Sequence, residues 1–319
     1  MLVDSARGFC TRPEVELAAG GRMTVFLDGF KVGHYTDERN RTGCTVVLPP
    51  PGNVASCDVR GSSPGSRELA SLDLERRLTE VHAVLLTGGS AFGLAAADGV
   101  MSWLAERNIG YETRVARVPI VPAAVIFDLA AGNAATRPGP EEGRAACDAA
   151  TSKDIATGRV GAGTGATVGK WGGLEESVRG GLGIGRASSD DAVVGALAVV
   201  NAVGDVVDAD GRSIAGSSAE SGRVLAPRPP GTEVAPVNTV LAVVATHATV
   251  DKRAVKWLAG RGSDGVTTSV RPAHTRYDGD VCFAVVAPLE AGAPEPDLDV
   301  LGVLATQAVA RAVRNAVGG

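Results

Sequence analysis

The sequence predicts a mixed α/β (α+β) protein in which two packed β-sheets are flanked by helices. Strand and helix patterns alternate irregularly along the 319 residues, and the strand patterns cluster around a glycine-rich middle. Several apolar runs also lack the two-residue alternation of a half-buried strand, as expected for strands covered on both faces. A doubly wound parallel sheet would need a more regular alternation, so it fits less well.

The first half of the chain contains three readable strands and two helices. Strands are predicted over residues 42–50, 82–88 and 122–129, and helices over 90–108, with Ser90 as N-cap, and over 138–151, entered after a proline. The second strand meets the first helix in a tight glycine turn. Its backbone amides at Gly88, Gly89 and Ser90 would point back toward the sheet end, an arrangement that suits oxyanions.

The second half begins with a glycine-dominated segment, residues 158–185, which predicts twisted strands with close backbone approach. Residues 192–211 predict a pair of buried strands, and residues 212–237 form a linker rich in Ser, Gly and Pro. After the linker the order is a strand over 239–250, a helix over 251–266, a loop over 271–280, a strand over 281–288 and a closing helix over 300–317.

Composition excludes several classes of protein. The chain has 31 basic and 36 acidic side chains, a net charge of -5, few aromatic residues and no basic block, so we expect no nucleic-acid partner. The longest apolar stretch is broken by Asn201, Gly204 and Asp205 before the roughly 18 residues that span a bilayer, so we expect no membrane segment. The N-terminus lacks a secretory signal, which favours a cytoplasmic protein.

The cysteines indicate neither a disulfide framework nor a zinc site. Their number is odd, and they are widely spaced without a C-x-x-C motif: Cys10, Cys44, Cys57, Cys147 and Cys282. We expect most of them to be small core residues.

The pair Asn238-Thr239 joins the linker to an abrupt apolar strand. Thr239 can be interpreted as the first residue of a buried strand whose hydroxyl caps the preceding turn. Alternatively, cleavage of the bond before Thr239 would place a hydroxyl and a free α-amine in one residue. That is the nucleophile and base of an amine-activated threonine hydrolase, and the intact chain would be a zymogen.

Motifs for cofactors fail on spacing. GAGTGATVGK is one residue too long for a phosphate loop, and Trp171 stands where Ser or Thr is needed; GGLGIGR lacks dinucleotide spacing. TGGSAFG has Phe92 where a nucleophile elbow needs glycine. His274, Asp278 and Asp280 are metal-ligand types, but the spacing suggests no fourth ligand. We therefore predict no cofactor and no metal.

Four polar residues remain as candidates for a site. Asp278 and Asp280, at a strand opening, either form an ordinary turn or share a proton and bind an ammonium group. Lys170 is either an exposed strand end or a paired, buried cation. Asn201 lies inside an apolar run, so its amide either braces a turn or lends an N–H to the site.

Together these segments resemble the P1 peptidases, the L-aminopeptidase/D-esterase group, which is similar to β-peptidyl aminopeptidases and nylon-oligomer hydrolases. The resemblance runs from about Gly33 to the C-terminus. It is carried by GHYTD, RTGCTVVL, CDVRGSSPGSRE, VLLTGGSAFGLAAADGVMSWL, VPIVPAAVIFDL, GRVGAGTGATVGK, VVNAVGDVVD, VNTVLAVVATHA and HTRYDGDVCFA.

The resemblance implies one peptidase domain over residues 1–319 with a four-layer α/β/β/α sandwich, similar to ornithine acetyltransferases and N-terminal nucleophile hydrolases. It also implies self-cleavage into an α-chain, 1–238, and a β-chain, 239–319. The processed units would form a homo-oligomer, with a tetramer as one form. The implied activity is hydrolysis of small peptides, amides or esters that have a free N-terminal amine.

By the same resemblance, Thr239 is the nucleophile, Lys170 lies near it, Asn201 contributes to the oxyanion site, and Asp278 and Asp280 are the acidic pair. A tyrosine used by several members is replaced by Phe127, so a phenol cannot stabilise the tetrahedral intermediate here. The amides of Gly88, Gly89 and Ser90 are the candidate substitutes.

Two other functions stay open at the level of sequence. An ornithine-acetyltransferase-like acyltransferase would use the same threonine chemistry, although that group usually has Ala rather than Asn before its threonine. A non-catalytic binding protein on the same fold would leave the chain uncleaved.

Overall fold

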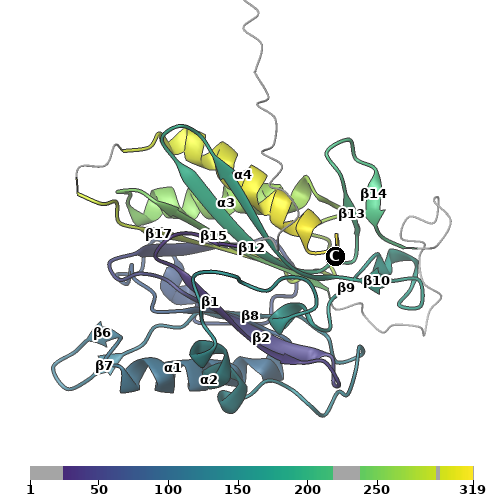
Figure 1. Ribbon diagram of the computed structural model, residues 1–319, viewed down its shortest axis with the longest axis horizontal. Helices are drawn as coiled ribbons and strands as arrows, with labels where there is room; N and C mark the ends of the chain where they lie inside the picture. Colours follow the sequence, from purple (N-terminus) through teal and green to yellow (C-terminus); the bar gives the residue numbers. More distant parts are fainter. Residues whose placement is uncertain (1–23, 218–237, 292–294, 319) are drawn as a thin grey trace, which may run out of the picture.

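The computed structural model describes residues 24–217, 238–291 and 295–318, and it contains four layers (Figure 1). Helices α3 (Lys252–Thr267) and α4 (Leu298–Asn315) cover one five-stranded sheet. A second five-stranded sheet packs beneath the first, and helices α1 (Ala96–Glu106) and α2 (Pro140–Asp148) cover its outer face. This arrangement confirms the predicted sandwich of two sheets flanked by helices.

The sheet that carries α1 and α2 has the order β1-β2-β5-β8-β4. Its strands are β1 (Lys31–Asp37), β2 (Thr42–Leu48), β5 (Val84–Thr87), β8 (Ala123–Val125) and β4 (Ser66–Arg67). Only the β5–β8 pair among these is parallel. The parallel pair requires a crossover, and α1 lies on that crossover between β5 and β8.

The sheet that carries α3 and α4 has the order β11-β12-β15-β17-β3. Its strands are β11 (Gly181–Ser188), β12 (Val193–Asn201), β15 (Thr239–His247), β17 (Val281–Ala287) and β3 (Val54–Val59). Successive side chains of β12 enter different cores. Val194 and Val200 pack beneath the helices, whereas Leu197 and Val199 pack between the sheets. Burial on both faces explains why the sequence shows so little alternation.

Shorter elements connect the layers. The 3-10 turns are η1 (Leu69–Leu72), η2 (Ser90–Ala95), η3 (Gly161–Gly163) and η4 (Lys170–Gly172). Small strands form three further sheets: β6 (Tyr111–Glu112) with β7 (Arg117–Val118), β9 (Thr167–Val168) with β10 (Val178–Arg179), and β13 (Asp205–Val207) between β14 (Ser213–Ala215) and β16 (Val270–Arg271).

Local predictions need three corrections. The helix expected from residue 90 begins as a 3-10 turn, whose N-cap is Gly89, and Ser90 makes no side-chain cap. The glycine-rich segment contains two 3-10 turns besides its strands, because glycines at 161 and 169 adopt positive φ. Residues 213–215 of the predicted linker form β14. Residues 218–237 of the linker and Cys10 lie outside the described part of the chain. The other four cysteines are free thiols, and they are buried, as predicted.

A row of glycines lets α4 lie directly on β11. A Cβ at Gly181, Gly183 or Gly185 would stand 2.5, 2.1 or 2.3 Å from the backbone carbonyl oxygens of Ala316, Ala312 and Ala308, respectively. The predicted close backbone approach is therefore present here, between a strand and a helix.

We expect Gly183→Ala to destabilise the protein by about 1–3 kcal/mol, because the new methyl group would collide with helix backbone that cannot move alone. Gly260→Ala is the matched control: its Cβ would meet only Arg60, at 3.8 Å, and alanine favours the helix. Thermal unfolding of both variants checks this. An unchanged melting temperature for Gly183→Ala would contradict the account of this contact.

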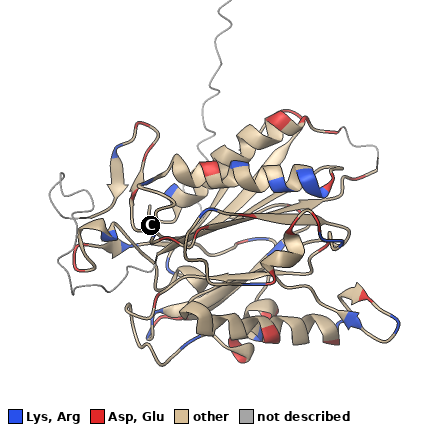
Figure 2. Ribbon diagram, turned by 180° about the vertical axis from the view of Figure 1, so that it is seen from behind, with Lys and Arg blue, Asp and Glu red and all other residues tan. Residues whose placement is uncertain are grey.

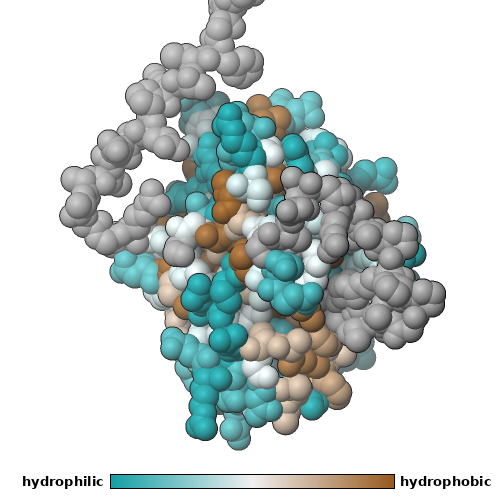
Figure 3. Space-filling model, turned by 90° about the vertical axis from the view of Figure 1, so that its right-hand side faces the viewer, coloured by the Kyte–Doolittle hydropathy of each residue, from teal (hydrophilic) through white to brown (hydrophobic). Residues whose placement is uncertain are grey.

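Figure 2 shows acidic and basic residues interspersed along the ribbon. The end of the molecule around β9, β10 and β14, seen in Figure 3, mixes hydrophilic and hydrophobic residues. Within the described ranges, no helix is long and apolar enough to cross a membrane.

Candidate active site

Thr239 is the first residue of β15 and lies beside the last residue of β12. The antiparallel register pairs Thr239 with Asn201, and their exposed fractions are 5% and 0%. The Thr239 hydroxyl donates to the Asn238 carbonyl oxygen at 2.5 Å. The prediction that Thr239 opens a buried strand is confirmed, and the register explains why Asn201 belongs to the same site.

Both backbone polar groups of Asn238 are hydrogen-bonded. Its N–H donates to the Tyr277 carbonyl at 3.2 Å, and its carbonyl accepts the Gly279 N–H at 2.8 Å. Its side-chain amide is buried, and neither the nitrogen nor the oxygen has a partner among the residues described. Such burial is costly, on the order of 1–3 kcal/mol.

Because residue 279 is a glycine, the loop before β17 can lie close to Thr239. A Cβ there would stand 2.6 Å from the Ser63 carbonyl oxygen and 2.9 Å from the Thr239 hydroxyl oxygen. The sequence indicates only that Gly279 stands between Asp278 and Asp280, in what could be an ordinary turn. Its D-G-D setting was a visible signal, but its contact with Thr239 depends on strand pairing across the sheet.

Lys170 is a buried cation, not an exposed strand end. It lies in η4, is 4% exposed, and its Nζ donates to the Asn201 side-chain oxygen at 2.8 Å and the Asn201 carbonyl at 3.1 Å. Burial lowers the pKa of Lys170 to about 7, although the charge of Asp278 opposes that shift. The lysine can therefore change its charge near neutral pH.

The side-chain oxygen of Asn201 accepts two hydrogen bonds, and its side-chain nitrogen donates one. The oxygen accepts from Lys170 and from the Thr167 N–H, at 3.0 Å, while Nδ2 donates to the Phe127 carbonyl at 3.3 Å. An amide nitrogen carries two hydrogens, so one remains for a ligand. Phe127, in the place of the tyrosine, contributes its backbone carbonyl here.

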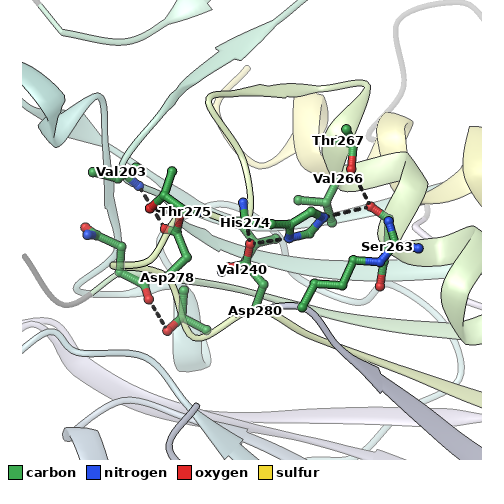
Figure 4. Close-up of polar contacts among 12 residues, drawn as sticks. Val203, Val240, Ser263, Val266, Thr267, His274, Thr275, Asp278 and Asp280 are labelled. Atoms are coloured by element: carbon green, nitrogen blue, oxygen red, sulfur yellow. Dashed lines mark hydrogen bonds and ion pairs between the residues drawn. The ribbon is translucent and has the colours of Figure 1, made fainter. Parts of the chain in front are cut away.

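The two predicted carboxylates have different surroundings (Figure 4). Asp278 accepts from the Thr275 N–H at 2.7 Å and its hydroxyl at 2.6 Å, whereas its other oxygen has only the Val203 N–H at 3.5 Å. Burial, and then the neighbouring charge of Asp280, raise the pKa of Asp278. Thr275 was missed from the sequence; its place three residues before Asp278 is a turn signal that could have indicated it.

Asp280 is bonded through both oxygens. One accepts the Val240 N–H at 2.6 Å, and the other accepts from the His274 ring at 2.7 Å and the His274 N–H at 3.2 Å. Its position is therefore fixed directly against β15, the strand that begins with Thr239. In the part of the chain that the structure describes, no group of three or more potential metal ligands is arranged to hold an ion.

The three predicted oxyanion amides already donate within the chain. The Gly88 N–H bonds the Gly43 carbonyl at 2.8 Å, the Gly89 N–H bonds Asp128 Oδ1 at 2.7 Å, and the Ser90 N–H bonds the Ile126 carbonyl at 3.0 Å. Each amide has a single hydrogen, so we do not assign these groups to an oxyanion. The structure brings together the other five predicted residues, namely Thr239, Asn201, Lys170, Asp278 and Asp280.

The four-layer fold is that of an N-terminal nucleophile hydrolase. The chain superposes with a TM-score of 0.70 and 19% identity, over 92% of this chain and 85% of the other, on the L-aminopeptidase D-Ala-esterase/amidase of Ochrobactrum anthropi, described as a variant of that fold. The sequence profile of peptidase family S58 matches residues 27–318. The protein belongs to peptidase family S58.

Its curated relatives agree with that membership. An uncharacterized aminopeptidase of Mycobacterium bovis is 40% identical, over 90% of this chain and 91% of the relative. A 6-aminohexanoate-oligomer endohydrolase of a Kocuria species is 31% identical, over 85% of this chain and 77% of the relative. The protein is thus a hydrolase of the aminopeptidase class, as the sequence predicted.

Proposed function

We propose that the chain cleaves itself before Thr239 and then acts as an N-terminal-threonine aminopeptidase or amidase on small substrates with a free amine. The products of processing would be residues 1–238 and 239–319, which stay associated. The observation that carries the proposal is the buried hydroxyl of Thr239, hydrogen-bonded to the carbonyl of Asn238 while Gly279 donates to the same oxygen.

Self-cleavage uses this carbonyl as its electrophile. The Thr239 oxygen attacks the Asn238 carbonyl carbon, and the Gly279 N–H stabilises the charge that develops on the carbonyl oxygen. The bond to the Thr239 nitrogen then breaks, the nitrogen takes up the proton that the hydroxyl gives up, and an ester links Asn238 to the threonine oxygen. Water then hydrolyses the ester, which leaves a carboxylate on Asn238 and a free hydroxyl beside the α-amine of Thr239.

The processed site would repeat this chemistry on a substrate. The α-amine of Thr239 accepts the hydroxyl proton as the oxygen attacks the scissile carbonyl, and it returns a proton to the leaving group. The second Asn201 amide hydrogen stabilises the oxyanion, and Lys170 orients that amide through its 2.8 Å hydrogen bond. Water then releases the acyl group.

Asp278 is the group best suited to the ammonium of a substrate. One of its oxygens has only a 3.5 Å contact, whereas both oxygens of Asp280 are occupied. The 31% identical 6-aminohexanoate-oligomer endohydrolase supports the amide bonds of short oligomers as a substrate class. A homo-oligomer of processed units and a cytoplasmic location complete the proposal.

Free-amine substrates should be strongly preferred. We expect alanine p-nitroanilide to be hydrolysed at least about 10- to 100-fold faster than its N-acetyl counterpart, because acetylation removes the cation that Asp278 binds. Asp278→Asn should shrink this preference, and Asp98→Asn, an exposed carboxylate bound to Arg67, should not. Equal rates on both substrates would reject the aminopeptidase assignment and favour a general amidase or acyltransferase.

A further inference from the structure

The His274 side chain has no role in the mechanism above, yet the fold holds it in place. It lies in the loop between β16 and β17 with a φ of 53°, a left-handed conformation that is uncommon outside glycine. Its side chain is 14% exposed. In Figure 4 the ring lies between Ser263 of α3 and Asp280.

Both ring nitrogens face groups that only accept hydrogen bonds. Nδ1 lies 2.7 Å from Asp280 Oδ2, and Nε2 lies 3.2 Å from the Ser263 carbonyl oxygen. A carbonyl and an ionised carboxylate have no hydrogen to give, so satisfying both contacts requires a hydrogen on each nitrogen. The ring is then an imidazolium cation paired with Asp280.

The charges around the ring favour this cation. Burial lowers the pKa of His274, but the hydrogen bond and the negative charge of Asp280 outweigh burial and raise it above 6.5. The Arg60 guanidinium opposes this, and its own charge is balanced by salt bridges to Asp58 and Asp264.

Asp280 connects the His274 ring to the start of β15, where Thr239 lies. Its Oδ2 accepts from the His274 ring and backbone, while its Oδ1 accepts the N–H of Val240, the residue that follows Thr239. A carboxylate is planar, so fixing one oxygen orients the other. The start of β15 is thereby connected to α3 through His274 and Asp280.

We propose that His274 is a positioning residue for the nucleophile: its ring fixes Asp280 on the Val240 amide, and this contact holds Thr239 in line with the scissile carbonyl. This inference rests on the proposed role of Thr239. A displacement of about 1 Å at a reacting atom can cost about 100-fold in rate, so the loss of this contact should affect the chemical step.

Kinetics of His274→Asn test the inference, because asparagine tolerates the left-handed backbone but carries no charge. We expect kcat to fall roughly 10- to 100-fold and KM for a free-amine substrate to change less than about threefold, since Asp278 is intact. His274→Gln is the second variant. His247→Asn, at the opposite end of β15, is the control and should keep wild-type kcat. Wild-type kcat in folded His274 variants, or an effect confined to KM, would overturn the proposal.

A titration by NMR tests the imidazolium itself, in the Thr239→Ala chain, which should stay whole. We expect the His274 ring to titrate with a midpoint above 6.5, and Asp280→Asn to lower that midpoint. His34 and His82, whose pKa values burial lowers, are internal references. A His274 midpoint below 6.5 would reject the inference whatever the activity. Turnover by Thr239→Ala would instead reject the proposed nucleophile.

Discussion

Thr239→Ala should remain one continuous chain and lose activity by about 10⁴-fold or more, because the proposed mechanism uses the hydroxyl both for self-cleavage and as the nucleophile of turnover. Intact-mass measurement should give two fragments for the wild-type protein, divided before Thr239, and one mass of the full 319-residue chain for the variant. Hydrolysis of alanine p-nitroanilide measures the loss of activity.

Thr239→Ser is the matched control, since it keeps an oxygen nucleophile and the hydrogen bond to the Asn238 carbonyl. We expect it to be cleaved and to retain activity within about 10-fold of the wild-type protein. A wild-type protein that is fully active as an uncleaved chain would refute the zymogen proposal. Cleavage of the alanine variant at the same bond would show that another group attacks Asn238.

The elements that the sequence predicted well are those with a strong local signal. Apolar runs bounded by Gly, Pro and polar turns located β2, β5, β15 and β17, and apolar periodicity located α3 and α4. Thr239 and Asn201 stood out for a related reason, because a polar residue inside or at the start of an apolar run must be satisfied. Their pairing in one site was implied by the resemblance alone.

The details that the sequence could not predict depend on contacts between distant segments. The amides of Gly88, Gly89 and Ser90 suited an oxyanion as an isolated strand–helix turn, but Gly43, Asp128 and Ile126 accept their hydrogens. The closeness of Gly279 to the Thr239 hydroxyl likewise follows from the pairing of β15 with β17. No local pattern encodes such register.

Lys170→Met should lower kcat by roughly 100- to 1000-fold, comparable to the loss of an oxyanion donor, because Asn201 loses the hydrogen bond that orients its amide and the site loses its cation. Lys252→Met is the control. Lys252 is also a buried lysine, bonded to the carbonyls of Ser71, Arg76 and Leu78, so its loss should affect stability and leave kcat close to wild type. Equal kcat values for Lys170→Met and the wild-type protein would remove Lys170 from the mechanism.

The same lysine should give stability a characteristic dependence on pH. The unfolded chain keeps Lys170 protonated up to about pH 10.5, whereas the folded chain releases the proton near its lowered pKa of about 7. Unfolding therefore takes up a proton between these values, so the free energy of unfolding should rise with pH in that window, by at most about 1.4 kcal/mol per pH unit. Below pH 7 both states are protonated and this slope disappears.

Urea unfolding of Thr239→Ala with and without Lys170→Met, from pH 6 to 10, isolates this contribution, because both chains stay whole and share their other titrating groups. We expect the free energy of unfolding of the chain that keeps Lys170, minus that of the methionine chain, to be constant below pH 7 and to increase with pH above it. At pH 6 the methionine chain should be at least as stable, since it buries no charge. Parallel curves across the whole range would mean that Lys170 keeps an ordinary pKa and is not the desolvated cation of this site.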